Sequence, residues 1–153
     1  MDTVKNIILR KPTLFVIVSC IYFVGLGLLK WKLRPPLDAM WFFLGGGIGL
    51  YFLDAAELFF QLNPSPFRSV IFSGLFTVVS LFIVTSSGST LASGLVLSLY
   101  LQMILWQVGE WRIVGNISSW YRMVALPVPF ALQRTLLGVF AALFLLESYF
   151  FIH

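Results

Sequence analysis

Two carboxylates lie in a long apolar stretch of the sequence, and they are the residues best placed to carry chemistry. Asp54 and Glu57 are three positions apart within residues 39–61, so on a helix both side chains lie on one face. Acidic side chains in a membrane-spanning helix are costly, and they therefore face a partner, a water pocket or the interior of a bundle. Two like charges this close repel each other unless a cation separates them. We therefore expect arginine side chains beside this pair.

Further polar residues fall at the same level once the apolar stretches are threaded through a membrane. At 1.5 Å per residue, Asp54 lies roughly 20 Å along its helix from Trp41, and Gln102 lies roughly 16 Å from Leu91. The sequence predicts one intramembrane polar cluster near one membrane face, with these members: Asp54, Glu57, Gln102, Gln107, Glu110, Arg68 and Arg134. Within it, Arg68 and Arg134 are the expected partners of the carboxylates. The cluster is a structural ion-pair layer, a vestibule that handles protons or ions, or an enzyme site.

Several kinds of catalytic and metal site are excluded by residue counts. The single histidine is His153 at the C-terminus and the single cysteine is Cys20, which rules out an intrachain disulfide and metal sites built from several cysteines or histidines. Walker-type, GxSxG, HExxH and CxxC motifs do not occur in the sequence. Asp54, Glu57 and Glu110 could in principle hold Mg²⁺ against a lipid phosphate, but acids three apart on a helix are common. We predict no metal and no cofactor, and lean against an enzyme.

Composition indicates a membrane protein. Hydrophobic residues make up 59% of the 153 and charged residues 10%, whereas soluble domains carry about 25% charge. No basic run suggests a nucleic-acid partner; the lipid bilayer is the expected surrounding.

The apolar stretches predict an all-α transmembrane bundle in a single domain. Proline- and serine-rich breaks separate five spans, near 13–30, 39–61, 67–85, 91–111 and 130–152. A short helix lying in the membrane interface is expected near 116–126, because the apolar residues of this segment share one helical face: Ile117, Trp120, Tyr121 and Val124.

Positive charge is unevenly distributed between the two sides of this threading. One side carries seven basic residues: Lys5, Arg10, Lys11, Arg68, Arg112, Arg122 and Arg134. The other side carries three: Lys30, Lys32 and Arg34. Because basic residues prefer the cytoplasmic side, we expect an N-in, C-out protein of a bacterial-type inner or plasma membrane. Processing of the first span at Cys20, which ends a lipobox-like sequence, stays an open alternative.

Small residues predict close helix packing. Gly45 and Gly49 are four positions apart, a spacing that lets another helix approach closely in lipid. We expect a tight crossing within the chain, with a homodimer contact as the alternative. Glu147, in the last span, is expected at the opposite interface or beside the basic turn of residues 30–34.

The chain's small size and short loops favour a non-catalytic subunit or an interaction and assembly protein in a membrane complex. The first alternative is a small transporter or channel-like homo-oligomer that uses Asp54, Glu57 and Glu110. The second is a lipid-modifying membrane enzyme.

Overall fold

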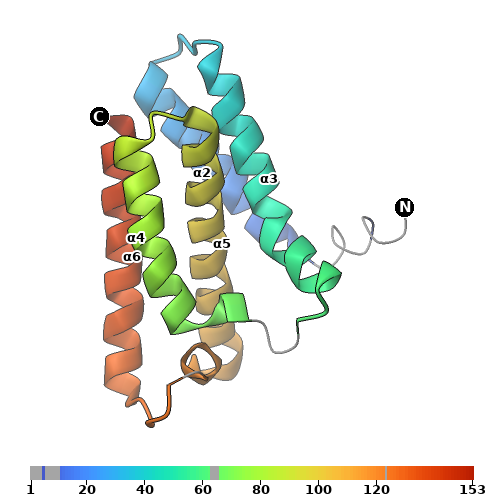
Figure 1. Ribbon diagram of the computed structural model, residues 1–153, viewed down its shortest axis with the longest axis vertical. Coiled ribbons are helices and arrows are strands. Elements are labelled where there is room, and N and C mark those ends of the chain that lie inside the picture. The colour runs from blue at the N-terminus through green and yellow to red at the C-terminus, as the bar shows by residue number, and fades with distance from the viewer. Residues whose placement is uncertain (1–4, 6–10, 63–65, 123) are drawn as a thin grey trace.

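The chain folds as an all-α bundle (Figure 1). The computed structural model describes residues 5, 11–62, 66–122 and 124–153, and within these ranges it contains no strand. The helices are α2 (Thr13–Trp31), α3 (Asp38–Phe59), α4 (Val70–Ser86), α5 (Thr90–Val114) and α6 (Phe130–Ile152), with the 3₁₀ helices η1 (Pro66–Arg68) and η2 (Ser118–Tyr121). The five predicted spans are therefore confirmed as helices, with ends shifted by at most three residues. Most of the proline- and serine-rich break between the second and third spans, at residues 63–66, lies outside the described residues.

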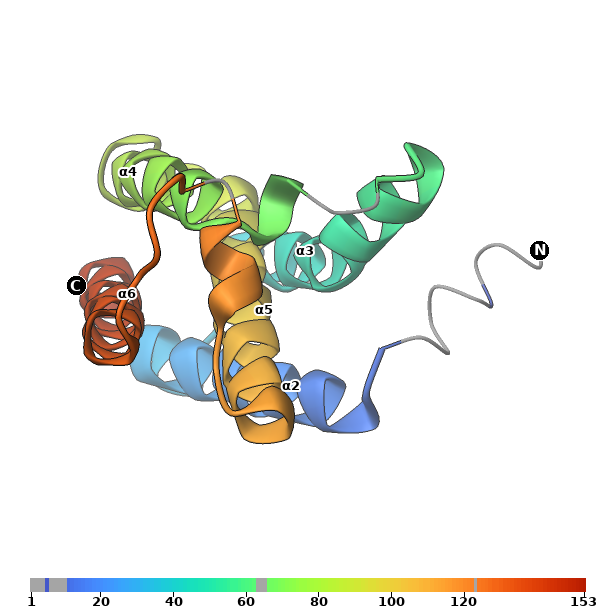
Figure 2. The ribbon, with the colours of Figure 1, turned by 90° about the horizontal axis from the view of Figure 1, so that it is seen from below.

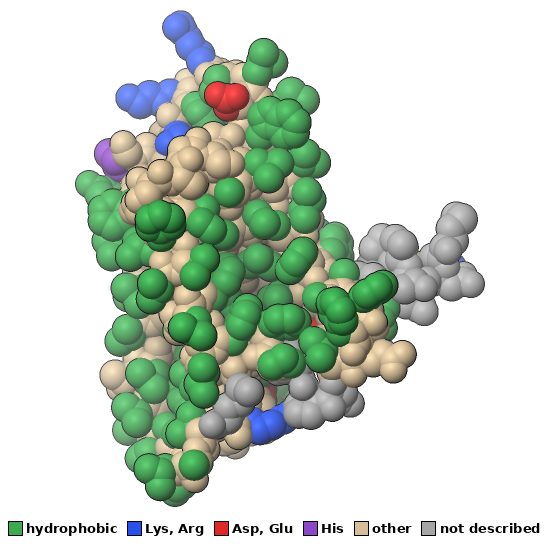
Figure 3. All heavy atoms as spheres, in the orientation of Figure 1, with side chains coloured by type: hydrophobic (Ala, Val, Ile, Leu, Met, Phe, Trp, Pro, Cys, Tyr) green, Lys and Arg blue, Asp and Glu red, His purple; other side chains and the backbone are tan. Residues whose placement is uncertain are grey.

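The central helix is α5, and the other four helices pack around it (Figure 2). In the most apolar 18-residue stretch of α5, 61% of the residues are buried, whereas the corresponding stretches of α2, α3 and α6 are 33% buried or less. Four helices, α2, α3, α5 and α6, are long and apolar enough to cross a membrane. The 17-residue α4 is about 26 Å long at 1.5 Å per residue. Hydrophobic side chains cover the face seen in Figure 3, and charged ones gather toward the two ends.

Local sequence explains where the helices begin and end. Ser69 and Ser89 have extended backbones, and their hydroxyl groups accept hydrogen bonds from Phe72 N and Ala92 N, so they cap α4 and α5. Gly115 ends α5 with a φ of 83°, a conformation that glycine adopts at no steric cost. Pro129 precedes α6, where its missing amide hydrogen is not needed.

Glycines allow α3 and α5 to touch backbone to backbone. A Cβ atom on Gly45 would lie 2.2 Å from the carbonyl oxygen of Leu91, and one on Gly49 would lie 2.7 Å from that of Leu95. From the other side, a Cβ on Gly94 would lie 2.2 Å from the carbonyl oxygen of Phe42. The tight crossing within the chain is thus confirmed.

Segment 116–126 differs from the prediction. Its helix is only the four-residue η2, and three of the four apolar residues, Ile117, Trp120 and Tyr121, are buried in the core of the bundle. Trp120 Nε1 donates a 2.9 Å hydrogen bond to the hydroxyl group of Ser73 on α4. The apolar side chains of this segment therefore pack against the end of the bundle. The apolar spacing did not distinguish this location from the membrane interface, because both offer apolar contacts.

The helices run alternately up and down (Figure 1). The α2–α3 turn, the α4–α5 turn and the C-terminus lie at the upper end of the figure. The start of α2 and the α3–α4 and α5–α6 connections lie at the other end, hereafter the lower end.

Candidate functional site

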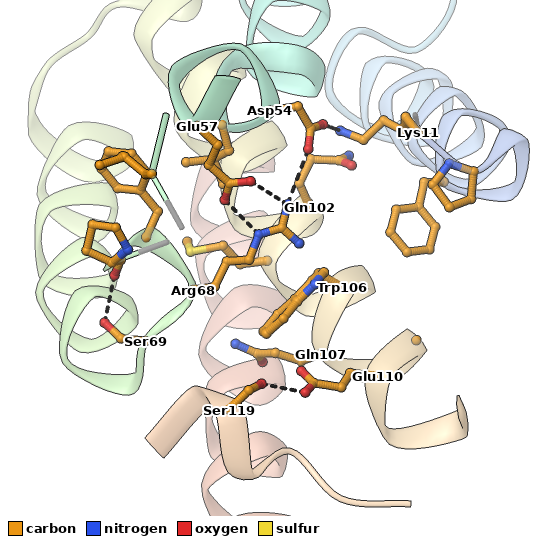
Figure 4. Close-up of a pocket in the computed structure, with 18 of the residues that line it drawn as sticks. Lys11, Asp54, Glu57, Arg68, Ser69, Gln102, Trp106, Gln107, Glu110 and Ser119 are labelled. Carbon is orange, nitrogen blue, oxygen red and sulfur yellow. Dashed lines mark hydrogen bonds and ion pairs between the residues drawn. The ribbon is translucent and has the colours of Figure 1, made fainter. Parts of the chain in front are cut away.

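A cavity of about 870 Å³ opens at the lower end of the bundle. Its walls come from the start of α2, the last turns of α3 and α5, and the η1 and η2 segments (Figure 4). Six of the seven residues of the predicted polar cluster line it: Asp54, Glu57, Arg68, Gln102, Gln107 and Glu110. Apolar side chains, among them Phe15, Leu53, Leu58 and Ile113, complete the lining.

Arg68 forms the predicted ion pair with the carboxylates of α3. Its Nε lies 2.7 Å from Glu57 Oε1 and its Nη2 lies 2.9 Å from Glu57 Oε2, while the same Nη2 lies 3.3 Å from Asp54 Oδ1. The two parallel bonds to Glu57 are the bidentate geometry that a guanidinium favours with a carboxylate. The opposite side of the group faces α5, where the Arg68 Cζ is 5.0 Å from the ring centroid of Trp106. Arg68 therefore occupies the gap between α3 and α5 and is held from both.

The second cation of the cluster is Lys11, which the sequence analysis did not select. Its Nζ lies 2.8 Å from Asp54 Oδ2 and also donates to the carbonyl oxygen of Leu50. The Lys11 side chain is only 6% exposed, and this burial lowers the pKa of its ammonium group, an effect that the neighbouring Asp54 partly offsets. The sequence contains a signal for this contact. Pro12 marks the start of α2, and because α3 runs antiparallel to α2, the residue before Pro12 lies at the level of the end of α3.

Arg134 does not join the cluster, so this part of the prediction is wrong. The residue is exposed, and among the described residues its guanidinium forms no ion pair within 4 Å. The reason is the arrangement of the helices: at the lower end α6 and α3 lie on different sides of α5 (Figure 2), and they meet farther up, where Phe42 stacks on Phe151.

Three further acceptor oxygens line the cavity and have no donor in the described part of the chain. Glu110 Oε1 accepts a hydrogen bond from the hydroxyl group of Ser119, and Gln102 Nε2 donates to the hydroxyl group of Ser19 at 2.7 Å. The other oxygens of these groups, Glu110 Oε2 and Gln102 Oε1, are buried and accept no hydrogen bond from the described residues, and the same holds for Gln107 Oε1. Gln107 is 1% exposed. Figure 4 shows Gln107 and Glu110 beside each other on α5.

The described cavity wall carries three acidic and three basic side chains, but they are not evenly matched. Lys11 and Arg68 pair with Asp54 and Glu57. Glu110 has only the hydroxyl group of Ser119, and among the described residues no cation lies within 4 Å of it. The remaining basic residue of the lining, Arg122, is exposed. The part of the cavity beside Glu110 is therefore short of positive charge.

A separate buried carboxylate, Glu147, lies in α6. It is 1% exposed, and Ser80 of α4 donates a 2.8 Å hydrogen bond to its Oε1. Its Oε2 accepts no hydrogen bond from the described residues. The expected location at the interface or beside the basic turn is wrong, because the polar face of α4 packs on α6. Lys30, an expected partner, instead donates to the carbonyl oxygen of Phe151.

The polar groups of the cavity can bind a ligand through hydrogen bonds and charge. Within the described part of the chain, no three of the His, Cys, Asp and Glu side chains lie close enough together to hold a metal ion. A cavity with paired charges and unpartnered acceptor oxygens instead suits a ligand that brings N–H or O–H donors. Comparison with protein-family models, with curated proteins and with solved structures finds no match for this chain.

Proposed function

We propose that this chain is a small, non-catalytic integral membrane protein that binds a polar ligand in the lower cavity and serves as a subunit or assembly protein of a membrane complex. One observation carries the proposal: the cavity of about 870 Å³ is lined by buried acceptor oxygens that receive no hydrogen bond from the described residues. A buried polar atom without a hydrogen bond costs about 1–3 kcal/mol. A ligand that supplies donors recovers this free energy, and the volume is in the range of small-molecule sites.

The state of the two α3 carboxylates, Asp54 and Glu57, supports binding over catalysis at their wall of the cavity. A general base needs a carboxylate that is within reach of the substrate and free to take a proton. Asp54 and Glu57 already accept charged hydrogen bonds from Lys11 and Arg68. The acidic pair therefore shapes one wall of the site and does not offer a free base.

The proposed orientation follows from the distribution of charge. The lower end carries most of the basic residues, so the positive-inside rule places it at the cytoplasmic face, with the N-terminus inside and the C-terminus outside. A bacterial-type plasma membrane is the proposed location. A partner subunit would dock outside the Gly45–Gly49 face, because α5 already fills that face.

The test is native mass spectrometry of the chain purified from its membrane in a mild detergent. We expect a bound small molecule or lipid on the wild-type chain and on an Arg134→Gln control. We expect the adduct to be lost in Gln107→Met, which keeps the size of the side chain and removes the amide. An adduct-free wild-type chain, or an adduct of equal occupancy in Gln107→Met, would contradict the proposal.

A second candidate, a small proton-coupled transporter, is favoured by Glu147. An ionised carboxylate buried without a cation is costly, and such residues in membrane helices often belong to proton relays. Ser80, which donates to Glu147, also lies 3.1 Å from the backbone carbonyl oxygen of Thr77, and the Thr77 hydroxyl group lies 3.2 Å from that of Tyr100. Proteoliposomes with an internal pH dye test this candidate: it requires proton flux that is lost in Glu147→Gln.

A further inference from the structure

We propose that the ligand of the lower cavity presents a primary ammonium group, which binds between Glu110 and Gln107. This inference rests on the proposed function and names the chemical class of its ligand. The shared chemistry is a compact cation with N–H donors, and it has two sources: the headgroup of a membrane lipid and a soluble amine.

Charge is the first argument. The ion pairs of Lys11 and Arg68 leave Asp54 and Glu57 compensated, while Glu110 faces the cavity with a hydroxyl group as its partner. A partly buried carboxylate is stabilised by a cation that also satisfies its second oxygen. An ammonium at Glu110 Oε2 supplies both the charge and the hydrogen bond that this atom lacks.

Hydrogen-bond geometry is the second argument. Gln107 and Glu110 are three residues apart on α5, so their side chains lie on one helix face. Each presents a buried oxygen without a donor among the described residues. A primary ammonium carries three N–H donors and no acceptor, so one such group can serve both oxygens and keep a third donor for water or for another oxygen of the ligand.

The same geometry disfavours a quaternary ammonium. A trimethylated nitrogen has no N–H group, so it would leave Gln107 Oε1 and Glu110 Oε2 without donors. Quaternary ammonium ions are usually bound by the open faces of aromatic rings. The lining holds the aromatic rings of Phe15, Phe67 and Trp106, and the largest of these, Trp106, already carries the guanidinium of Arg68, whose Cζ lies 5.0 Å from the ring centroid. We therefore expect discrimination between primary and quaternary ammonium groups.

The position of the cavity favours an amphiphilic ligand. The cavity lies at the end of the apolar helices, the level at which lipid headgroups would lie. Apolar residues of its lining, Ile113 and Val114, are exposed on the outside of the bundle. Arg122, also part of the lining and exposed, can meet the phosphate of a zwitterionic headgroup.

The experiment measures binding by the purified full-length chain in detergent micelles. The probes are phosphatidylethanolamine and phosphatidylcholine with identical acyl chains, and soluble ethylamine. Adducts are counted by native mass spectrometry over a concentration series, and thermal unfolding is followed in parallel. We expect phosphatidylethanolamine to bind at least about tenfold more tightly than phosphatidylcholine, a difference that two lost hydrogen bonds to a charged group readily produce.

Two variants and one control connect the preference to the site. Glu110→Gln and Gln107→Met should each reduce the preference to about twofold or less, whereas Arg134→Gln should leave it unchanged. If Glu110→Gln does not fold, Gln107→Met carries the same test. If ethylamine raises the melting temperature of the wild-type chain as much as the lipid does, and does not do so in Gln107→Met, the ligand is a soluble amine and the ammonium site stands.

The remaining outcomes overturn the inference and separate it from the proposed function. Equal binding of the two lipids with no effect of ethylamine contradicts the ammonium site. If the chain then still carries a native adduct that Gln107→Met removes, the cavity binds a ligand of another class and the proposed function survives. If the native chain carries no adduct and none of the probes binds, both fail.

Discussion

Replacing Arg68 by glutamine tests the charge cluster most directly, because this one side chain contacts two carboxylates. Glu57 has Arg68 as its cation, with bonds of 2.7 and 2.9 Å, whereas Asp54 also has Lys11 at 2.8 Å. Arg68→Gln therefore leaves Glu57, whose side chain is 11% exposed, without a cation within the described structure. Glu57→Gln is milder, because Arg68 keeps Asp54 at 3.3 Å.

The expected losses follow from this difference. Removing one partner of a fully buried ion pair costs about 3–5 kcal/mol. Because the Arg68 side chain is 27% exposed, water screens part of this charge, and we expect about 2–3 kcal/mol for Arg68→Gln. For Glu57→Gln we expect about 1–2 kcal/mol, and for the double variant less than the sum of the two, with a coupling free energy of about 1–2 kcal/mol.

The assay is equilibrium unfolding of the purified chain by titration of a mild detergent with dodecyl sulfate, followed by far-ultraviolet circular dichroism. The matched control is Arg134→Gln, an exposed arginine of α6, which should change the free energy of unfolding by no more than about 0.5 kcal/mol. Additive losses in the double variant would refute the pairing of Glu57 with Arg68. An equal loss in Arg134→Gln would refute the specificity of the cluster.

Three further predictions concern packing, pH and threading. Gly45→Ala should destabilise the chain by about 3 kcal/mol, because its Cβ would lie 2.2 Å from the Leu91 carbonyl oxygen. The control Gly47→Ala lies on the same helix with nothing within 4 Å of its Cβ, and it should be neutral or stabilising by up to about 1 kcal/mol. Equal effects of the two variants in the unfolding assay would contradict the close crossing. Burial lowers the pKa of Lys11 below its ordinary 10.5, so the folded chain releases this proton first, and the stability of the wild type relative to Lys11→Gln should rise as the pH increases toward 10.5. A flat difference would mean that Lys11 is solvated in the folded chain, and a falling difference would mean that its ion pair with Asp54 outweighs its burial. The threading is tested with single cysteines in a Cys20→Ala background and a membrane-impermeant maleimide. Cysteines at Leu33 and Ser87 should be labelled from one side of sealed vesicles, and a cysteine at Leu62 should be labelled from the other side. Labelling of positions 33 and 62 from the same side would contradict the alternating threading.

The level of each polar group along its helix could be predicted from the sequence, but its direction around the helix often could not. Apolar length and helix breaks placed Asp54, Gln102 and Glu110 at one end, where the structure has them. Arg134 was assigned to the correct end and the wrong side of the bundle. The direction of α6 is hard to infer because apolar residues surround most of this helix, so no single apolar face identifies the buried side.

Two features that differ from the prediction have a signal in the sequence. Ser73, Thr77 and Ser80 are spaced so that they form one polar face of α4. A polar face in a membrane helix indicates a polar group on a neighbouring helix, and the structure has Glu147 opposite Ser80. Lys11 lies in a basic N-terminal segment, but it directly precedes Pro12, which marks the start of the first span. The glycine spacing was more reliable, because the absence of a side chain has one dominant use in a membrane helix, which is close approach.

The position of α5 has a consequence for biogenesis. The helix on which the others pack, α5, is synthesised after α2, α3 and α4, so these three helices emerge before their main packing surface exists. Folding proceeds largely in the order of synthesis. The ion pairs at the lower end need only residues between Lys11 and Arg68. These charges can therefore neutralise one another in the nascent chain and hold α2, α3 and the start of α4 together. The later arrival of α5 then closes the glycine seam between Gly45 and Gly94 and completes the cavity.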